Sequence, residues 1–421
     1  MFLLRIYLLL CASAATALAP PTPTHFRLAR GSLIPPPLLP PLATNATPNN
    51  PMSLLDLDSI EHFAESHGLK EAHVSTLYNA FLRRGSAGCG LSEPRSDLPS
   101  LSELTDKSFP KSAASSLLSS FSALSTSVSK VVPSSSGGYR LLILLPTGQS
   151  IETVIIKHMH TNGKTRYTVC LSSQVGCARA CSFCATGTIG LKENLPASSI
   201  LEQFLHAQLL LASKDIPASS LTNVVFMGQG EPLDNYGEVL KSLRGLTHQC
   251  LFNLSPSRIT VSTVAPVPSI IKRLADDAPA VNLAVSLHGA TQELRELTVP
   301  SARGTSIEEL GAALDYHAKK SGRGAMLEYL LIDGVNDGDL AAESLASFAR
   351  ARGSQLKPFV NLIPYNPTLA GAAFSYKTPT DERINSFHAL LKNEKIQSSV
   401  RWSSAAGRDA GAACGQLVLG E

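Results

Sequence analysis

Several absences limit what this chain of 421 residues can be. No apolar run reaches the ~20 residues that a membrane-spanning helix needs, so no membrane partner is expected. The net charge is small, because 36 basic residues face 33 acidic ones. Residues 1–50 contain three Arg and no Asp or Glu, which leaves residues 51–421 with 33 charges of each sign. Bulk charge therefore gives no argument for a nucleic-acid partner. Hydrophobic residues make up 44% of the chain, which excludes a wholly disordered protein.

The acid-free N-terminus is typical of a targeting leader. Residues 1–19 combine Arg5 with an apolar stretch and then small residues in A-x-A order, as signal peptides do. Residues 20–51 contain ten of the 27 prolines, which indicates a transit-like segment and not a folding unit. The two parts in series predict a leader over residues 1–51 that directs the protein to a plastid (chloroplast). Secretion, a mitochondrion and the cytoplasm are the alternatives.

Beyond the leader, the spacing of apolar residues changes along the chain. Residues 52–111 have apolar side chains at helical spacing and predict a helical accessory domain. Residues 112–136 contain 12 serines, and the composition of residues 112–138 predicts a linker, although the apolar residues within the segment could also support a helix. Residues 139–172 contain three β-rich runs, which predict a small antiparallel β-extension.

From residue 195 onward, strand-like and helix-like stretches alternate. The strand-like stretches are short apolar runs, as expected for strands with both faces covered: Leu221–Met227, Arg258–Thr263, Val281–His288, Ala325–Ile332 and Pro358–Ile363. Repeated units of this kind imply a parallel sheet with right-handed crossovers. The pattern predicts an α/β fold, with a partial (β/α)6 barrel over residues 173–405 in preference to a complete eight-stranded one. Its site should lie at the carboxyl ends of the strands.

Three cysteines lie close together just after the last β-rich run. Cys177, Cys181 and Cys184 form a C-x3-C-x2-C triplet. A closed structural zinc site needs four ligands. A four-iron cluster held by three cysteines leaves one iron open to a substrate, so the spacing favours a cluster. A zinc site completed by Cys170 or a histidine, and three unrelated thiols, are the alternatives.

The triplet, with Phe183 inside it, resembles the signature of the radical S-adenosylmethionine (SAM) enzymes. Further motifs follow in order along the chain: Cys170–Cys177, Met227–Pro232, Ser286–His288, Asn361–Pro367 and Ala412–Leu417. Together they resemble the dual-specificity ribosomal and transfer RNA adenine-C2 methyltransferases. The resemblance covers about residues 139–421, with a weaker match at Tyr78–Gly85.

This resemblance implies a radical SAM fold, cofactors and partners. The cofactors would be a [4Fe–4S] cluster on the three cysteines and two molecules of SAM per turnover, one as methyl donor and one as radical source. The positions that match SAM contacts in the family are Gly230, Glu231, Ser262, Ser286, Leu287, His288 and Asn366. The substrate would be an adenosine in large-subunit (23S-type) rRNA, and one beside the anticodon in tRNA. RNA would dock on residues 52–111, a flavodoxin or ferredoxin would supply electrons, and the protein would be a monomer.

The resemblance also implies three catalytic residues. Cys414, in the C-terminal segment 406–421, would take a methyl group from one SAM. A 5′-deoxyadenosyl radical from the second SAM would abstract hydrogen from that methyl, and the resulting methylene would add to adenine C2. Cys170 would release the product by forming a disulfide bond with Cys414. Glu152 would accept the C2 proton.

The strand pattern predicts the surroundings of two of these residues. Cys170 alternates with Thr168 and Ser172, so it need not sit in apolar packing. Glu152 shares one strand face with Val154 and Ile156, an apolar environment that could raise the pKa of its carboxyl. The alternative for Glu152 is a protective charge on an edge strand.

Two other functions fit part of the pattern. A sister methyltransferase acting on adenine C8 would share the cluster and both catalytic cysteines. A zinc-stabilised RNA-binding module without catalysis would explain the cysteine triplet alone.

Overall fold

The computed structural model describes most of the chain beyond the predicted leader. The described residues are 51–82, 96–106, 109–159, 163–352, 358–402 and 415–417. They all belong to one compact unit, residues 48–421. Of the predicted leader only Pro51 is described, so this prediction lies outside the described residues. Within the described part, no helix is both long and apolar enough to cross a membrane.

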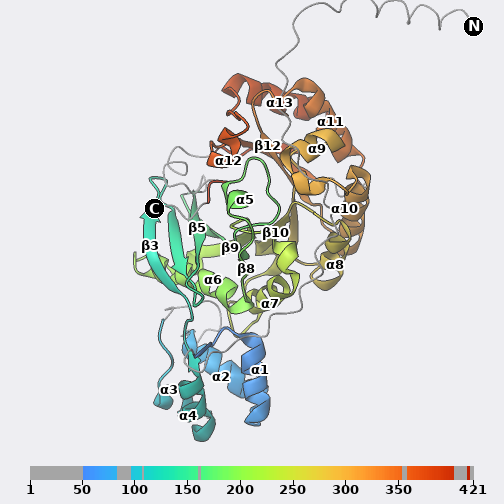
Figure 1. Ribbon diagram of the computed structural model, residues 1–421. Coiled ribbons are helices and arrows are strands. Elements are labelled where there is room, and N and C mark those ends of the chain that lie inside the picture. Colours follow the sequence, from blue (N-terminus) through green and yellow to red (C-terminus); the bar gives the residue numbers. More distant parts are fainter. Residues whose placement is uncertain are drawn as a thin grey trace, which may run out of the picture. The chain divides into compact units, whose positions relative to one another are not determined.

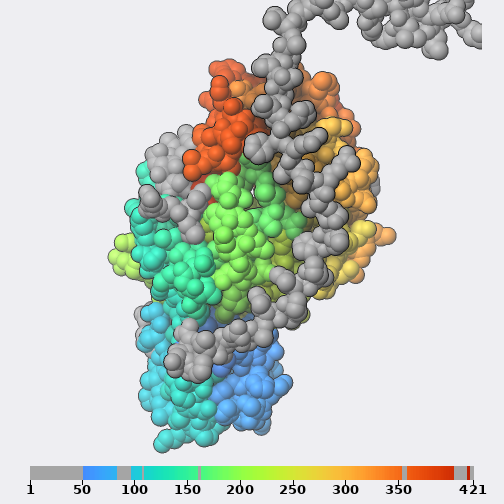
Figure 2. All heavy atoms as spheres, viewed as in Figure 1, coloured from blue at the N-terminus to red at the C-terminus, as the bar shows by residue number. Residues whose placement is uncertain are grey.

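The first part of the described chain is helical, as predicted. It contains α1 (Leu57–Ser66), α2 (Glu71–Phe81) and α3 (Leu101–Thr105). Asp56 caps α1 by accepting a hydrogen bond from the Ser59 amide, and Ile60 and Phe63 bury the apolar face. Figure 2 shows the blue surface of α1 and α2 beside the cyan surface of residues 96–122.

The prediction of a Ser-rich linker over residues 112–138 is wrong. This segment forms α4 (Lys111–Ser120), β2 (Phe121–Ser122) and the edge strand β3 (Ser127–Pro133). β2 pairs in parallel with β1 (Met52–Ser53). Long-range contacts override the polar composition, because Ala113, Ala114 and Leu117 are buried and the turn after β2 is tied to a helix of the barrel.

The predicted β-extension has four strands and not three, because β3 from the Ser-rich segment joins its edge. β3 pairs antiparallel with β4 (Tyr139–Leu144), β4 with β5 (Ser150–Met159), and β5 with β6 (Thr165–Cys170). β6 then pairs in parallel with β9 (Leu221–Phe226), so the extension and the parallel strands form one continuous sheet.

The parallel part confirms the predicted partial barrel. After β9 the strands follow in chain order: β10 (Ile259–Thr263), β11 (Asn282–Ser286), β12 (Met326–Leu331), β13 (Phe359–Pro364) and β14 (Ser398–Val400). The ten-stranded sheet has the order β14-β13-β12-β11-β10-β9-β6-β5-β4-β3 and stays open, with β3 and β14 at its edges.

Helices connect the parallel strands on the outside of the curved sheet (Figure 1). They are α6 (Ala197–Ala212), α7 (Tyr236–Thr247), α8 (Ser269–Asp277), α10 (Ile307–Ser321), α11 (Asp339–Arg350) and α13 (Asp381–Asn393). Short elements complete the connections: α5 (Ala185–Ile189), α9 (Gln292–Thr298), α12 (Leu369–Ala372), β7 (Gln174–Val175) and β8 (Glu193–Asn194). Within the described ranges, turns of 3-10 helix lie at 218–220, 232–235, 256–258 and 300–302.

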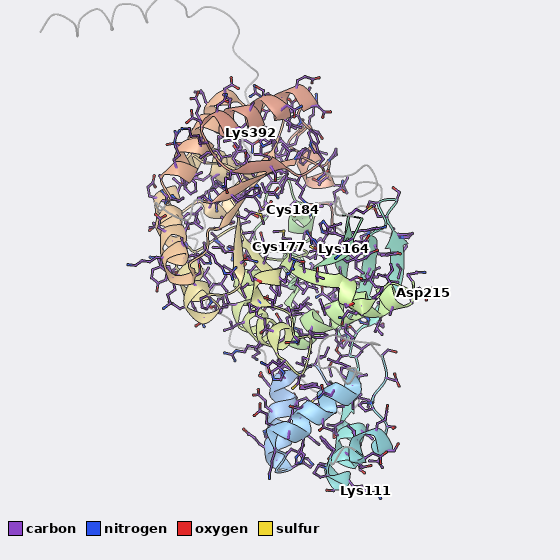
Figure 3. The ribbon with its side chains drawn as sticks, turned by 180° about the vertical axis from the view of Figure 1, so that it is seen from behind. Lys111, Lys164, Cys177, Cys184, Asp215 and Lys392 are labelled. Atoms are coloured by element: carbon purple, nitrogen blue, oxygen red, sulfur yellow. The ribbon has the colours of Figure 1, made fainter. Side chains whose placement is uncertain are left out.

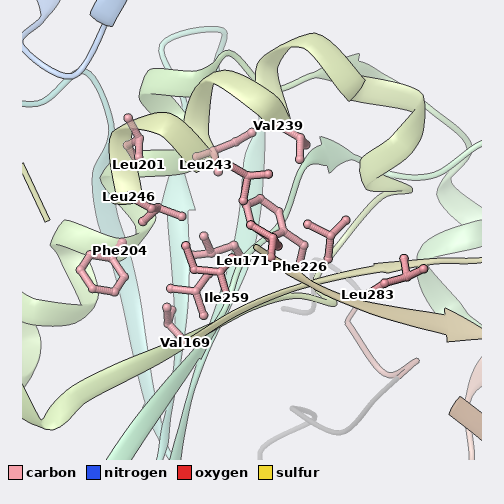
Figure 4. Packing of buried hydrophobic residues seen from close by; sticks show 14 of the residues in the cluster. Val169, Leu171, Leu201, Phe204, Phe226, Val239, Leu243, Leu246, Ile259 and Leu283 are labelled. Carbon is pink, nitrogen blue, oxygen red and sulfur yellow. The ribbon is translucent and has the colours of Figure 1, made fainter. Parts of the chain in front are cut away.

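The main core lies between the strands and these outer helices. Figure 4 shows Leu171 and Phe226 from the strand side packed against Leu201 of α6 and Leu243 of α7. Alternation along each strand sends every second side chain into this core and the others to the inner face of the sheet. On β12, for example, Tyr329 joins the main core, whereas Leu330 belongs to a separate inner cluster with Ile363.

Candidate active site

The cysteine triplet lies on a loop between β7 and α5. The pairing of β7 with β8 closes the base of this loop, and the Cys177 amide donates a hydrogen bond to the Gly190 carbonyl. Figure 3 places Cys177 and Cys184 close to each other near the centre of the molecule. Ala180 has φ +48°, a left-handed conformation unusual for a residue with a Cβ, and it bends the chain between the first two cysteines.

The three thiols are close enough to influence one another electrostatically. Burial raises the pKa of Cys177 to about 12, and the neighbouring Cys184 adds to this. Burial also raises the pKa of Cys181 well above its usual value, with further contributions from Cys184 and Cys177. The three thiols therefore lie near one another, and their binding of a cluster stays a prediction.

Contacts from three other segments hold this loop in place. Arg179 forms two hydrogen bonds with the Asp234 carboxylate, at 2.6 and 2.5 Å. The Ser182 amide donates to the Thr298 carbonyl at 3.1 Å. Thr368 donates a hydrogen bond from Oγ1 to the Phe183 carbonyl at 2.9 Å. The loop is thus fixed against elements that follow β9, β11 and β13.

Gly230 and Glu231 follow β9 at its carboxyl end, as predicted. Gly230 has φ +101°, and a Cβ there would lie 2.6 Å from the Cβ of Gln174, so only glycine fits. Glu231 is buried, and its two carboxylate oxygens accept hydrogen bonds from the amides of Leu233 and Val264. Burial raises the pKa of Glu231 to about 7, and these hydrogen bonds oppose the rise.

The predicted serines lie on the neighbouring strands, near their carboxyl ends. Ser262 is on β10, and Ser286 is the last residue of β11. The buried Arg295 of α9 donates hydrogen bonds to the carbonyls of Ser286 and Leu287. Burial lowers the pKa of Arg295 to about 10, whereas the nearby Cys181 and Glu231 oppose this shift. Sequence reasoning missed Arg295, although it follows the Ser286–His288 motif by only a few residues.

His288 has a strained backbone that its neighbours stabilise. Its φ is +55°, its carbonyl accepts a hydrogen bond from Asn336, and its Nδ1 accepts one from the Leu330 amide. Burial lowers the pKa of His288 to about 3, and Arg295 adds to the shift. The ring is therefore neutral and carries its proton on Nε2. The ring of Phe183, from the cysteine loop, packs edge-on against it at 4.7 Å.

Glu152 and Cys170 share one face of the antiparallel strands. Cys170 lies directly opposite Val154, two residues along β5 from Glu152. Glu152 is 1% exposed, and burial raises its pKa to about 7, as the sequence predicted. β5 pairs with strands on both sides, so the interpretation of Glu152 as an edge-strand charge is wrong.

Cys170 does sit in apolar packing, although its alternation with Thr168 and Ser172 had indicated that it need not. Cys170 packs in a small apolar cluster with Val154 and Leu417, and Val225 and Met227 border it. The alternation along β6 correctly indicated the face, but it could not reveal that Leu417, from the other end of the chain, covers it.

Cys414 lies outside the described residues, but the three residues that follow it are described. The Gly415 carbonyl accepts a hydrogen bond from the Ala185 amide, directly after Cys184. The Leu417 carbonyl accepts one from Thr186 Oγ1 at 2.8 Å. Residues 415–417 thus contact both the helix that follows the cysteine triplet and the cluster around Cys170.

The residues present fit a SAM-bound iron–sulfur cluster. Asn366 is buried, and within the described chain its Nδ2 donates to no partner, which leaves a donor for a ligand. Among the described residues, no three His, Cys, Asp or Glu side chains are grouped to hold a single metal ion. A four-iron cluster does not require the three thiolates to converge on one point, because each thiolate binds a different iron atom.

Comparisons with known proteins agree with this geometry. Residues 171–343 match the model of the Radical SAM superfamily, which defines the class of enzyme. The chain is 44% identical to the probable dual-specificity RNA methyltransferase RlmN of Moorella thermoacetica, over 66% of this chain and 75% of that protein. It is 38% identical to the ribosomal RNA large subunit methyltransferase N of Nitrosopumilus maritimus, over 69% and 79%. The chain therefore belongs to the RlmN family of radical SAM RNA methyltransferases.

A solved structure supports the same assignment. The crystal structure of a radical SAM methyltransferase from Sphaerobacter thermophilus superposes with a TM-score of 0.73 at 35% identity, covering 87% of this chain and 99% of that one. Membership of this class implies a [4Fe–4S] cluster and SAM as cofactors, and the family implies RNA as substrate.

Proposed function

We propose that this enzyme methylates C2 of an adenosine in large-subunit rRNA, and of an adenosine beside the anticodon in tRNA. The observation that supports this proposal most directly is the position of residues 415–417. They follow Cys414 directly and contact both the segment after Cys184 and the cluster around Cys170. A cysteine beside this segment is well suited to act between the radical source and Cys170.

Cys177, Cys181 and Cys184 would hold the cluster. Gly230, Glu231, Ser262, Ser286, Leu287, His288 and Asn366 would contact SAM. Glu231 suits the ammonium group of SAM, because a buried carboxylate strongly favours a cationic partner. When bound, these cofactors supply a methyl group from one SAM and a hydrogen-abstracting radical from a second.

The three catalytic residues divide the remaining chemistry. The Cys414 thiolate takes the first methyl group by displacement, and loss of one hydrogen atom turns its S-methyl into a methylene radical. This carbon bonds to adenine C2, and Glu152 accepts the C2 proton. Cys170 then attacks the Cys414 sulfur to give a disulfide.

The atoms and electrons balance in this release. The bond between sulfur and methylene breaks with its electron pair on carbon, which takes a proton and becomes the product methyl. The surplus electron from radical addition leaves to a one-electron carrier. Two electrons must then reduce the disulfide, and a flavodoxin or ferredoxin has the right chemistry to supply them.

The experiment that tests this function replaces Cys170 by alanine. Cys170→Ala should assemble the cluster and cleave SAM, but it should remain crosslinked to its RNA through Cys414 and a one-carbon bridge. Mass spectrometry of the nuclease-trimmed Cys414 peptide detects the adduct. Cys414→Ala is the control, which should load the cluster and form no adduct. A Cys170→Ala protein that cleaves SAM and carries no nucleotide contradicts the methylcysteine route.

The proposal also covers RNA docking, oligomeric state and localisation. The helices of residues 52–111 would dock RNA, and the enzyme would act as a monomer. The leader over residues 1–51 would direct it to a plastid, where iron–sulfur assembly is available; the alternatives are a mitochondrion and the cytoplasm.

The second candidate function is methylation of adenine C8, which would use the same residues. The motif set resembles the C2 branch more, and the position of the product methyl distinguishes the two. Metal analysis tests the third candidate, a zinc-stabilised RNA-binding module, which would contain zinc without iron or sulfide.

A further inference from the structure

Glu152 is paired with a cation that has no role in the proposed function. Arg140, on β4, lies 2.5 Å from Glu152, measured from Nη1 to Oε1. The pairing of β4 with β5 places Leu142 opposite Glu152 and Arg140 opposite Val154, so Arg140 is the diagonal neighbour of Glu152 on the same face. The Arg140 side chain is 17% exposed, so water screens this ion pair less than it would a surface pair.

The two carboxylate oxygens of Glu152 have different surroundings. Oε1 accepts the hydrogen bond from Arg140, whereas Oε2 is buried and has no hydrogen-bond partner in the described part of the chain. The main chain of Glu152 is also fixed, because Ser172 Oγ donates to its carbonyl at 2.6 Å. Ser172 Oγ in turn accepts a hydrogen bond from the Gln229 amide. One oxygen is therefore held and the other is left for a proton.

We propose that Arg140 is a positioning residue for proton removal: it holds Oε1 of Glu152 and leaves Oε2 to take the proton from adenine C2. This inference rests on the proposed function, in which Glu152 is the proton acceptor. In the step, the C2–H bond breaks and its electron pair stays in the ring. A new O–H bond forms at Oε2, and the neutral acid later returns the proton to water.

The electrostatics of the pair support this role. Burial raises the pKa of Glu152 to about 7, and both the charge and the hydrogen bond of Arg140 oppose the rise. On the same face, β6 contributes Cys170 and Arg166, and β3 contributes the exposed Lys130, opposite Leu142. The Gln229 side chain is neutral, and its Oε1 accepts a hydrogen bond from the main-chain amide of Glu152 at 3.4 Å. Arg140 is the cation that contacts the carboxylate, so it keeps a buried base ionised near neutral pH.

The test compares pH profiles of Arg140→Gln with wild type. The measured quantity is the ratio of methylated adenosine to 5′-deoxyadenosine, from about pH 6 to about pH 9. SAM cleavage precedes proton removal, so 5′-deoxyadenosine should form at the wild-type rate. On the acid side of the profile, the ratio falls as Glu152 becomes protonated; this part of the curve is the acid limb. Removing a close opposite charge should move the acid limb to higher pH by about one to three units. A shift of one unit from a pKa of about 7 lowers the ratio at pH 7 roughly 5-fold.

Matched variants make the result specific. Arg140→Lys keeps the charge and should restore most of the lost ratio. Arg166→Gln removes an arginine from the same face of β6, where it contacts Thr168 and Asn223, and should leave the profile in place. If Arg140→Gln fails to load a cluster, Arg140→Met is the second neutral variant, since it preserves the aliphatic stem. A neutral variant that loads the cluster and keeps the wild-type acid limb overturns the proposal.

Glu152→Gln separates this inference from the function on which it rests. If Glu152→Gln methylates RNA as well as wild type, Glu152 is not the proton acceptor, and the role proposed for Arg140 fails with it. If Glu152→Gln is inactive while the acid limb of Arg140→Gln stays in place, only the inference about Arg140 is wrong.

Discussion

Replacing Glu202 by glutamine should destabilise the junction between the helical segment and the barrel. Glu202, on α6, is fully buried and accepts hydrogen bonds from the amides and hydroxyls of Ser125 and Thr126, at 2.6 to 3.0 Å. The Thr126 hydroxyl gives its hydrogen to Glu202, so it must accept the hydrogen bond from His206 Nε2. Burial lowers the pKa of His206 to about 4, which keeps that ring neutral.

The expected loss in the free energy of unfolding follows from this geometry. Glutamine has one acceptor oxygen, so its amide nitrogen must face either the Ser125 or the Thr126 pair of donors. With the glutamine oxygen at the Oε2 position, both amides and the Thr126 hydroxyl keep an acceptor, because the Ser125 amide donates to either oxygen. The Ser125 hydroxyl then faces the amide nitrogen and must rotate away, and the three remaining hydrogen bonds lose their charged partner. A hydrogen bond to a charged group contributes about 1 kcal/mol more than one to a neutral group, so we expect a total loss of about 2–4 kcal/mol.

Urea unfolding and amide hydrogen exchange measure this loss. Exchange at Ser125 and Thr126 should accelerate selectively in Glu202→Gln, because the amides there lose their charged acceptor. Glu343→Gln, at an exposed position of α11, is the matched control and should change neither quantity. The reasoning fails if Glu202→Gln unfolds within about 0.5 kcal/mol of wild type, the range of an ordinary surface change.

Four other predictions follow from the site and the leader. Cys181→Ala should lose the four-iron absorbance, since two thiolates remain; full iron content would contradict the assignment. Gly230→Ala should weaken SAM binding, because at φ +101° its Cβ would meet both the side chain and the amide nitrogen of Gln174, and equilibrium dialysis measures this. Glu152 has a folded pKa of about 7, above its unfolded value, so its contribution to stability falls as pH rises from about 4.5 to about 7. In the cofactor-free protein, Glu152→Gln should therefore gain up to about 3 kcal/mol relative to wild type over that window, and a pH-independent difference would refute this. A fluorescent fusion of residues 1–51 should enter plastids, and appearance only in the medium would refute the plastid address.

The parallel strands could be predicted because their signals are local. Runs such as Leu221–Met227 and Ala325–Ile332 are apolar and short, and the structure places β9 and β12 within one residue of them. The carboxyl ends of these strands then carry Gly230, Glu231 and Ser286, as expected for a parallel sheet.

The errors came from contacts between distant residues. Ser125 and Thr126 belong to a Ser-rich stretch whose composition predicts a linker, and their hydrogen bonds to Glu202, more than 70 residues away, help to order it. The surroundings of Cys170 depend in the same way on Leu417. Arg140 could not be recognised either, because its pairing with Glu152 depends on strand register.

The central claim, methylation of adenine C2 through a cysteine-bound methylene, is tested by one reaction. Reconstituted enzyme is incubated without oxygen with SAM whose methyl group carries three deuterium atoms, a reductant and an RNA substrate, and the nucleosides are analysed by mass spectrometry. Because one hydrogen of the methyl group is abstracted before transfer, the account predicts 2-methyladenosine with two deuterium atoms and 5′-deoxyadenosine with one. A product that keeps all three deuterium atoms, or that is 8-methyladenosine, would contradict it.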